Sequence, residues 1–155
     1  MFRGNTEINV DNKGRFAVPT KYRAMLKEQS GGRVVVTIDT DSPCLLIYPL
    51  NVWQVIEEKI QSLPTFNAAT RRIQRLLIGH AHECELDAQG RVLLAPVLRK
   101  HAQIDKKLML VGQGKKFEVW SETRWESECQ AWLEQGVGTS EDGVQVPAIL
   151  NDLSV

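Results

Sequence analysis

An internal duplication constrains the fold of this chain more than any other feature of its sequence. Residues 8–23 (INVDNKGRFAVPTKYR) align with residues 84–100 (CELDAQGRVLLAPVLRK) once one extra residue is allowed in the second copy. An apolar strand follows the loop in each copy and ends at a proline, Pro19 or Pro96. A unit of about 45 residues buries little core by itself, so we expect the two copies to interlock. The alignment superimposes three loop positions: Asp11 on Asp87, Gly14 on Gly90 and Arg15 on Arg91.

The similarity continues downstream and gives each copy the same plan. Residues 34–53 resemble residues 108–125, and both segments have the pattern of a strand, a turn, a strand and a helix. Each copy is therefore predicted to be strand, loop, strand, short helix, β-hairpin and helix. The fold class that follows is mainly β with short α-helices (α+β), in which two half-repeats form one pseudo-two-fold interlocked β-barrel with peripheral helices.

The helices and the domain organisation follow from the same pattern. Asn51 to Gln54 has the form of a capping box for a helix, and a linker helix is expected over roughly 67–78, with Gly79 ending it. After Ser121, a last helix carries an apolar stripe suited to the core or to a subunit contact, and the acidic tail from Gln135 is expected to be flexible. The predicted domains are a first repeat (5–52), a helical linker (53–80), a second repeat (81–124) and a C-terminal helix with its tail (125–155).

The composition restricts the cellular compartment and the classes of binding partner that we expect. The chain has 155 residues, 25% of them charged, and a formal net charge of zero, which disfavours a uniformly basic nucleic-acid binder. The charge is nevertheless uneven, because residues 1–33 are rich in Lys and Arg whereas residues 118–155 are rich in Asp and Glu. The sequence has neither a long apolar run nor the apolar region of a signal peptide, and its three cysteines are far apart. We therefore expect a cytoplasmic protein in a reducing setting.

The paired loops DNKGR (11–15) and DAQGR (87–91) are the leading candidates for a binding site. We expect each loop to form the tip of a hairpin, where its glycine takes a positive φ and its aspartate accepts hydrogen bonds from the turn. The aspartate can also hold the arginine four residues on, and a held guanidinium suits phosphate or the edge of a guanine. The same Asp–Arg pair could instead serve the structure of the loop alone. The candidate DNA-binding residues are Arg15, Arg91, Lys13, Asp11, Asp87, Gly14 and Gly90.

These motifs resemble the MraZ family, bacterial transcriptional regulators related to the AbrB-type DNA-binding proteins. The resemblance extends to about Leu133. It rests on long, ordered motifs, which makes it specific: MFRG, DNKGR followed by VPTKYR, PCLLIYPL, RRIQRLLIGHAHECELD, DAQGR followed by LLAPVLRKHA, and LMLVGQ.

The resemblance implies an architecture and a function. It implies two AbrB-like half-repeats in one chain, subunits assembled into a ring-shaped homo-oligomer, and a DNA-binding surface made by the two loops. It also implies double-stranded DNA as partner: short direct repeats in the promoter of the division and cell-wall gene cluster, usually including the regulator's own gene, which is typically repressed. A nucleoid-associated location follows, with no cofactor, no small-molecule substrate and no membrane partner.

Four alternatives compete with DNA binding. His80, His82 and Cys84 alternate and could bind a metal, although the spacing is not typical of zinc sites and we predict no metal. Asp11 and Asp87 could form a catalytic carboxylate pair, but each has its own arginine to keep it ionised, so we predict no enzyme activity. The loop 112–116 (GQGKK) resembles a phosphate-binding loop at what is expected to be a hairpin turn. An antitoxin-like protein-interaction module is the remaining alternative.

Overall fold

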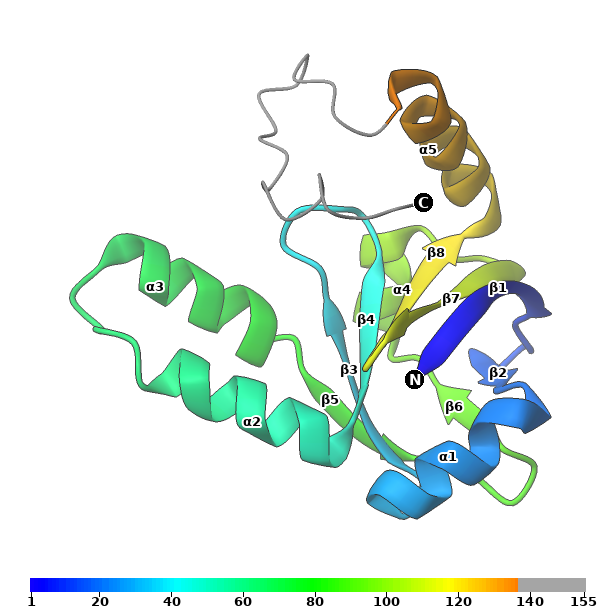
Figure 1. Cartoon of the computed structure of the whole chain (residues 1–155), viewed down its shortest axis with the longest axis horizontal. Coiled ribbons are helices and arrows are strands. Elements are labelled where there is room, and N and C mark those ends of the chain that lie inside the picture. Colours follow the sequence, from blue (N-terminus) through cyan, green and yellow to red (C-terminus); the bar gives the residue numbers. More distant parts are fainter. Residues whose placement is uncertain (137–155) are drawn as a thin grey trace, which may run out of the picture. The chain divides into compact units, whose positions relative to one another are not determined.

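The computed structural model describes residues 1–136, and its elements follow the expected order (Figure 1). One compact unit runs from Met1 to Glu122, and a second unit begins at Thr123. The flexible tail expected after Gln135 lies, from residue 137 on, outside the described residues. The strands are β1 (Phe2–Asn9), β2 (Arg15–Ala17), β3 (Arg33–Ile38), β4 (Leu45–Pro49), β5 (His82–Glu85), β6 (Arg91–Leu93), β7 (Lys107–Gly114) and β8 (Phe117–Ser121). The helices are α1 (Thr20–Ser30), α2 (Leu50–Gln61), α3 (Ala68–Ile73), the π-helical turn η1 (Gln74–Ile78), α4 (Pro96–Ala102) and α5 (Glu122–Gln135).

The two copies interlock through their strands. The six-stranded antiparallel sheet has the order β1-β7-β8-β4-β3-β5, so strands of one copy pair with strands of the other. Exchanging each strand for its counterpart in the other copy (β1 for β5, β3 for β7, β4 for β8) reverses this order. The sheet therefore has pseudo-two-fold symmetry about the β4–β8 pair. Strands β2 and β6 form a second, two-stranded sheet with Phe16 opposite Val92 at its centre. The predicted class, mainly β with interlocked half-repeats, is confirmed.

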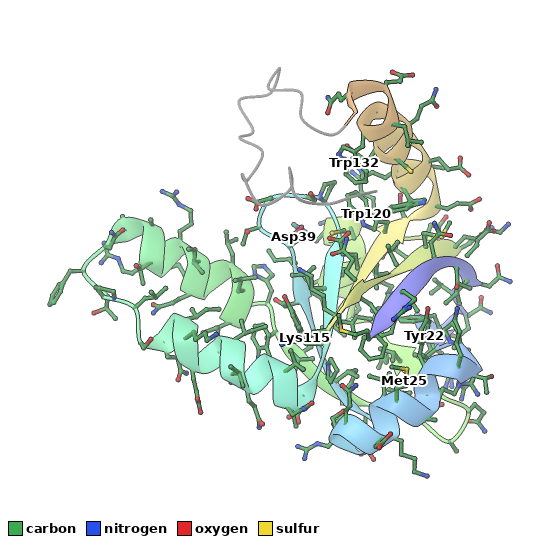
Figure 2. The ribbon with its side chains drawn as sticks, in the orientation of Figure 1. Tyr22, Met25, Asp39, Lys115, Trp120 and Trp132 are labelled. Atoms are coloured by element: carbon green, nitrogen blue, oxygen red, sulfur yellow. The ribbon has the colours of Figure 1, made fainter. Side chains whose placement is uncertain are left out.

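The short β2–β6 sheet lies next to both edge strands of the large sheet and completes the barrel. Strand β1 contacts β2, and β5 contacts β6. Alternate residues of β3, namely Val34, Val36 and Ile38, face a core that also contains Phe16 and Val92. Tyr22 of α1 packs its ring against the aromatic rings of the strands, including Phe117 at 5.0 Å (Figure 2). In the part of the chain that the structure describes, no helix is long and apolar enough to cross a membrane.

A second apolar cluster lies on the other face of the β3–β4 hairpin. Val35 and Tyr48 alternate with the core residues of their strands and pack with Trp53 of α2. Helix α2 and the segment α3–η1 together form a helical arm beside this hairpin (Figure 1), where Gln74 Nε2 donates to the Ile60 carbonyl at 3.3 Å. The linker is therefore anchored to the first repeat.

The predicted capping box at the start of α2 is wrong. The helix begins at Leu50, and the residue before it, Pro49, occupies the cap position with φ −55° and ψ 142°. Asn51 thus lies inside the first turn, and no side-chain cap hydrogen bond forms. Because the fixed φ of Pro49 suits the entry into a helix, the chain turns two residues earlier than the pattern indicated.

The linker helix ends at Gly79 as expected, but for a different reason. Gly79 has φ −64°, so it does not use the left-handed conformation of a typical glycine stop. Its N–H donates to the Gln74 carbonyl at 3.1 Å, which is the wider spacing of a π turn. A Cβ at this position would collide with the Arg75 carbonyl, so the glycine is required for space.

Two further expectations about the repeat are corrected. The loop 11–15 does not form the tip of a hairpin, because β1 pairs with β7 and β2 pairs with β6. No extra residue is needed in the second copy before its helix: Pro19 and Ala95 are the equivalent cap residues, with φ −52° and −60°. Pro96 is therefore the first residue of α4 rather than the counterpart of Pro19.

The apolar stripe of α5 is not core within the described residues. Helix α5 begins directly after Ser121, as expected, but has no buried residue. Trp132 is 43% exposed and Leu133 is 78% exposed, while the rings of Trp125 and Trp132 meet edge to face at 6.0 Å. A subunit contact through this stripe stays a prediction.

Candidate nucleic-acid interface

The first loop (11–15) is closed by its own aspartate. Asp11 Oδ1 accepts hydrogen bonds from the backbone N–H groups of Lys13 (2.9 Å) and Arg15 (2.8 Å). Asp11 Oδ2 accepts one from Arg15 Nε at 2.8 Å. The N–H of Gly14 donates to the Asp11 carbonyl at 3.0 Å, and Gly14 has φ +83°, a conformation that favours glycine. One carboxylate thus fixes both the backbone of the loop and its arginine.

The second loop (87–91) repeats this geometry. Asp87 Oδ1 accepts from the N–H groups of Gln89 (3.0 Å) and Arg91 (2.9 Å), and Oδ2 accepts from Arg91 Nε at 2.7 Å. Gly90 has φ +72°. The Nη2 atom of Arg91 also donates to Gln89 Oε1 at 3.2 Å. Gln89 occupies the position of Lys13, so the second arginine has a partner in its own loop that the first copy does not offer.

The two loops lie next to each other across the pseudo-two-fold axis. The Val18 N–H donates to the Gly90 carbonyl and the Leu94 N–H donates to the Gly14 carbonyl, both at 2.9 Å. Arg91 Nη1 lies 4.0 Å from Asp11 Oδ2, so an ion pair links the copies. The side chains of the two aspartates and two arginines are 28–35% exposed, which leaves them within reach of a polyanion.

Both loop carboxylates are held in their ionised form. The pKa of Asp11 is lowered from 3.8 to about 2, chiefly because the backbone N–H of Arg15 donates to it, with the Arg15 side chain adding to the effect against an opposing desolvation. The pKa of Asp87 is lowered for the same reasons, through Arg91. A catalytic carboxylate pair needs one partner to retain a proton. The geometry therefore favours an arginine-holding role over proton exchange between the two aspartates.

The other predicted site residues take different places in the loops. Lys13 is exposed, and its ammonium is available to a ligand. Gly14 and Gly90 are buried beneath arginine side chains from the opposite repeat. The loops therefore present cations outward and bury their glycines inward.

Arg23 and Arg99 belong to this site, although neither is among the DNA-binding residues predicted from the sequence. Arg23 Nε donates to the Val18 carbonyl at 2.6 Å, and Arg99 Nε donates to the Leu94 carbonyl at 3.2 Å. A Cβ at Gly14 would lie 2.7 Å from the Arg99 guanidinium carbon, and a Cβ at Gly90 would collide with Arg23. Each loop is thus covered by an arginine of the other copy. Arg23 lies eight residues after Arg15, and Arg99 lies eight residues after Arg91. An alignment of the two copies without an inserted residue therefore matches Arg23 with Arg99.

The His–Cys group and the GQGKK segment, which are the alternative metal and phosphate sites, lie outside these two loops. Among residues 1–136, His80, His82 and Cys84 do not form a group whose ligand atoms lie within 4.8 Å of one another. The ligand atoms of Asp39 and Cys44 in the β3–β4 turn and of Glu118 in the neighbouring strand β8 do, and Figure 2 labels Asp39. The GQGKK segment forms the β7–β8 turn, where the Gln113 N–H donates to the Lys116 carbonyl at 2.9 Å.

Comparison with known proteins places the chain in a family. The family model for the MraZ protein, which describes its members as antitoxin-like, matches twice, over residues 1–76 and 77–137. A transcriptional regulator MraZ of Serratia proteamaculans is 52% identical over 141 residues, covering 91% of this chain and 93% of that protein. Proteins of the same name from Photorhabdus laumondii (58% over 125 residues, 81% and 82% covered) and Escherichia coli O9:H4 (55% over 130 residues, 84% and 86% covered) are similar along most of their length. With a duplicated fold, paired loops and these relatives, the chain belongs to the MraZ family.

Proposed function

We propose that this chain is a sequence-specific regulator of transcription that binds double-stranded DNA through its two Asp-x-x-Gly-Arg loops and has no enzymatic activity. The observation that carries the proposal is the meeting of Arg15 and Arg91 on one partly exposed surface, each held by an ionised aspartate. Relatives named transcriptional regulator support it.

The loop geometry suits a polyanion because the arginines are positioned before binding. Asp11 and Asp87 engage Nε of each guanidinium, and each Nη carries two N–H groups, so those not used by Gln89 or Asp11 can donate to phosphate or to O6 and N7 of a guanine. Holding the side chain beforehand reduces the conformational entropy that binding must cost. Lys13 adds an exposed cation to the first loop. We therefore assign the direct contacts to Arg15, Arg91 and Lys13, and the positioning to the aspartates.

We further propose that several copies act together as a ring on short direct repeats in the promoter of the division and cell-wall gene cluster, which includes the gene of this chain, and that they repress it in the nucleoid. A chain of zero net charge with two arginine loops makes few phosphate contacts, so its own affinity is weak and salt-sensitive. Linked binding events raise avidity by about 10² to 10⁴. Loops on one side of a ring meet the same groove face once per helical turn, about 10–10.5 base pairs.

Gel-shift titration with the promoter upstream of the gene tests the proposal. Arg15→Ala is expected to weaken binding at least tenfold and to lower the salt dependence, whereas light scattering shows an unchanged oligomer. Arg72→Ala is the matched control, because Arg72 is an exposed arginine of α3 away from the loops. Wild-type affinity in Arg15→Ala would remove the assigned role, and a control variant that loses binding equally would remove its specificity.

A second candidate function is an antitoxin-like protein interaction, which the description of the family model favours. The exposed stripe of α5, with Trp132 and Leu133, offers an apolar surface for a protein partner. Co-purification from the native cell distinguishes the two: a stoichiometric protein partner that dissociates when Leu133 is replaced by Ser supports this candidate, and a preparation free of such a partner opposes it.

A further inference from the structure

The outer face of the β2–β6 sheet is a small, well-defined surface between the two loops. In β2 and β6 the central residues Phe16 and Val92 are buried, so the flanking residues point outward. Arg15 lies directly opposite Leu93, and Ala17 lies directly opposite Arg91. Residues directly opposite in an antiparallel pair share one face, with Cβ atoms about 5 Å apart. We call these four residues, Arg15, Ala17, Arg91 and Leu93, the ribbon face.

Leu93 stands out on the ribbon face. It is 54% exposed, and its neighbour across the strands is the arginine of the first loop. A scattered exposed leucine is ordinary on a protein surface. This one instead lies on a face whose other large side chains are those of Arg15 and Arg91, and the loop that leads into β2 carries exposed Lys13. Leu93 lies opposite Arg15 and two residues from Arg91 on the same face, and the floor of the DNA major groove likewise presents apolar methyl groups between anionic backbones.

We propose, as an extension of the DNA-binding function above, that Leu93 contacts the C5-methyl group of a thymine and so determines part of the sequence preference. The major groove is wide enough for a two-stranded β-ribbon, and the thymine methyl is its apolar feature. With Arg15 and Arg91 engaged on phosphate or guanine, the Leu93 side chain reaches the base next to the one that Arg15 faces. Leu93 is thus a specificity-determining residue, and the affinity comes from the arginines.

The ribbon face also gives the site a direction. On the ribbon face Leu93 corresponds to Ala17, and in the two loops that lead into its strands Gln89 corresponds to Lys13, so the pseudo-two-fold counterparts are unequal. One half of the surface therefore carries the apolar contact and the other half carries the additional cation. A DNA element that fits both halves is asymmetric, which suits repeats that all run in one direction.

Deoxyuridine substitution tests the contact, because it removes the thymine methyl and keeps base pairing. The probe is a duplex that the full-length protein selects from a random-sequence pool, with each thymine replaced in turn and binding followed by fluorescence anisotropy. For the wild type, one thymine position per repeat is expected to lose affinity roughly fourfold, as for one methyl group withdrawn from an apolar contact. Leu93→Ala is expected to bind the unsubstituted duplex more weakly and to show no loss at that position.

A matched control and an exchange variant sharpen this test. Val97→Ala removes a similarly exposed apolar side chain (52%) of the same repeat outside the ribbon face, and it should keep the wild-type deoxyuridine response. The double variant Ala17→Leu with Leu93→Ala should move the sensitive thymine to the opposite half of each repeat. A sensitive position that persists in Leu93→Ala, or the lack of any such position in the wild type, overturns the proposal while DNA binding stands. A wild type that selects no duplex overturns the proposed function together with this inference.

Discussion

Asp11 organises its loop from two sides, since one carboxylate oxygen holds backbone N–H groups and the other holds the guanidinium of Arg15. Loss of the Asp11 charge would weaken its hold on both the backbone N–H groups and the Arg15 guanidinium. The lowered pKa of Asp11 is a consequence of these bonds, so it links the loop to the stability of the fold.

We predict that Asp11 contributes to acid sensitivity in a defined pH window. Because its pKa falls from 3.8 to about 2 on folding, the stabilisation is present above about pH 4 and is lost as the pH falls toward 2. Asp11→Asn should therefore be less stable than the wild type at pH 7, and the difference in melting temperature should shrink by pH 2. Scanning calorimetry from pH 7 to 2 measures this. Asp105→Asn, at an exposed carboxylate, is the control, and a pH-independent difference for Asp11→Asn would contradict the prediction.

Gly14 combines two demands that can be separated experimentally. It has φ +83° and also lies under Arg99, whereas Gly31 has φ +64° and open space around its Cα. Gly31→Ala should cost about 1 kcal/mol from the backbone alone, and Gly14→Ala about 1 kcal/mol more, because Arg99 must leave its hydrogen bond to Leu94. Urea unfolding measures both.

The double variant checks the assigned cause. If Arg99 accounts for the additional cost, Gly14→Ala introduced into Arg99→Ala should cost only as much as Gly31→Ala does in the wild type. An additional cost that survives the removal of Arg99 would show that another contact crowds Gly14.

Among the elements, the helical arm is tied to the barrel by a buried hydroxyl. Thr37 of β3 is fully buried and donates from Oγ1 to the Leu77 carbonyl of η1 at 2.6 Å. Thr37→Val keeps the shape but leaves that carbonyl unpaired, so we predict a loss of about 1–3 kcal/mol in the free energy of unfolding. Thr20→Val, at an exposed residue of α1, should change it by less than about 0.5 kcal/mol. Equal effects of the two substitutions would contradict the role of this hydrogen bond.

At the same scale, the success of sequence reasoning depended on how local each feature is. The order of strands and helices followed from the repeat and from apolar periodicity, which are local properties of the chain. The strand that pairs with β1 could not be predicted from these local properties. The loop suggested a hairpin with β2, but β1 pairs with β7, about 100 residues away. The start of α2 was misplaced because Pro49 outweighed the capping pattern at Asn51.

The same distinction explains the site. Asp11, Gly14 and Arg15 form their bonds within five residues, so the sequence predicted the internal geometry of the loop. Arg23 and Arg99 reach across to the opposite copy, which requires knowledge of how the copies pack. The contact with DNA, for all these residues, stays a prediction.

For the whole molecule, interlocking implies that neither half folds alone as a monomer. Residues 1–80 lack β7 and β8, the partners of β1 and β4, and residues 81–136 lack β3 and β4, the partners of β5 and β8. We predict that each fragment is unfolded when monomeric and that an equimolar mixture regains the circular dichroism spectrum of the intact chain. Analytical ultracentrifugation would identify the complex. A folded monomer of either fragment would contradict the interlocked architecture.

The pseudo-two-fold symmetry of the strand order has a consequence for how such a protein can evolve. In a dimer of two identical short chains, one mutation changes both subunits, so a mutation that weakens binding weakens it in both halves. In a duplicated chain each half has its own codons, and a mutation in one loop leaves the other loop, and its share of the binding, unchanged. The sequence preference of the two loops can then change gradually, one loop at a time.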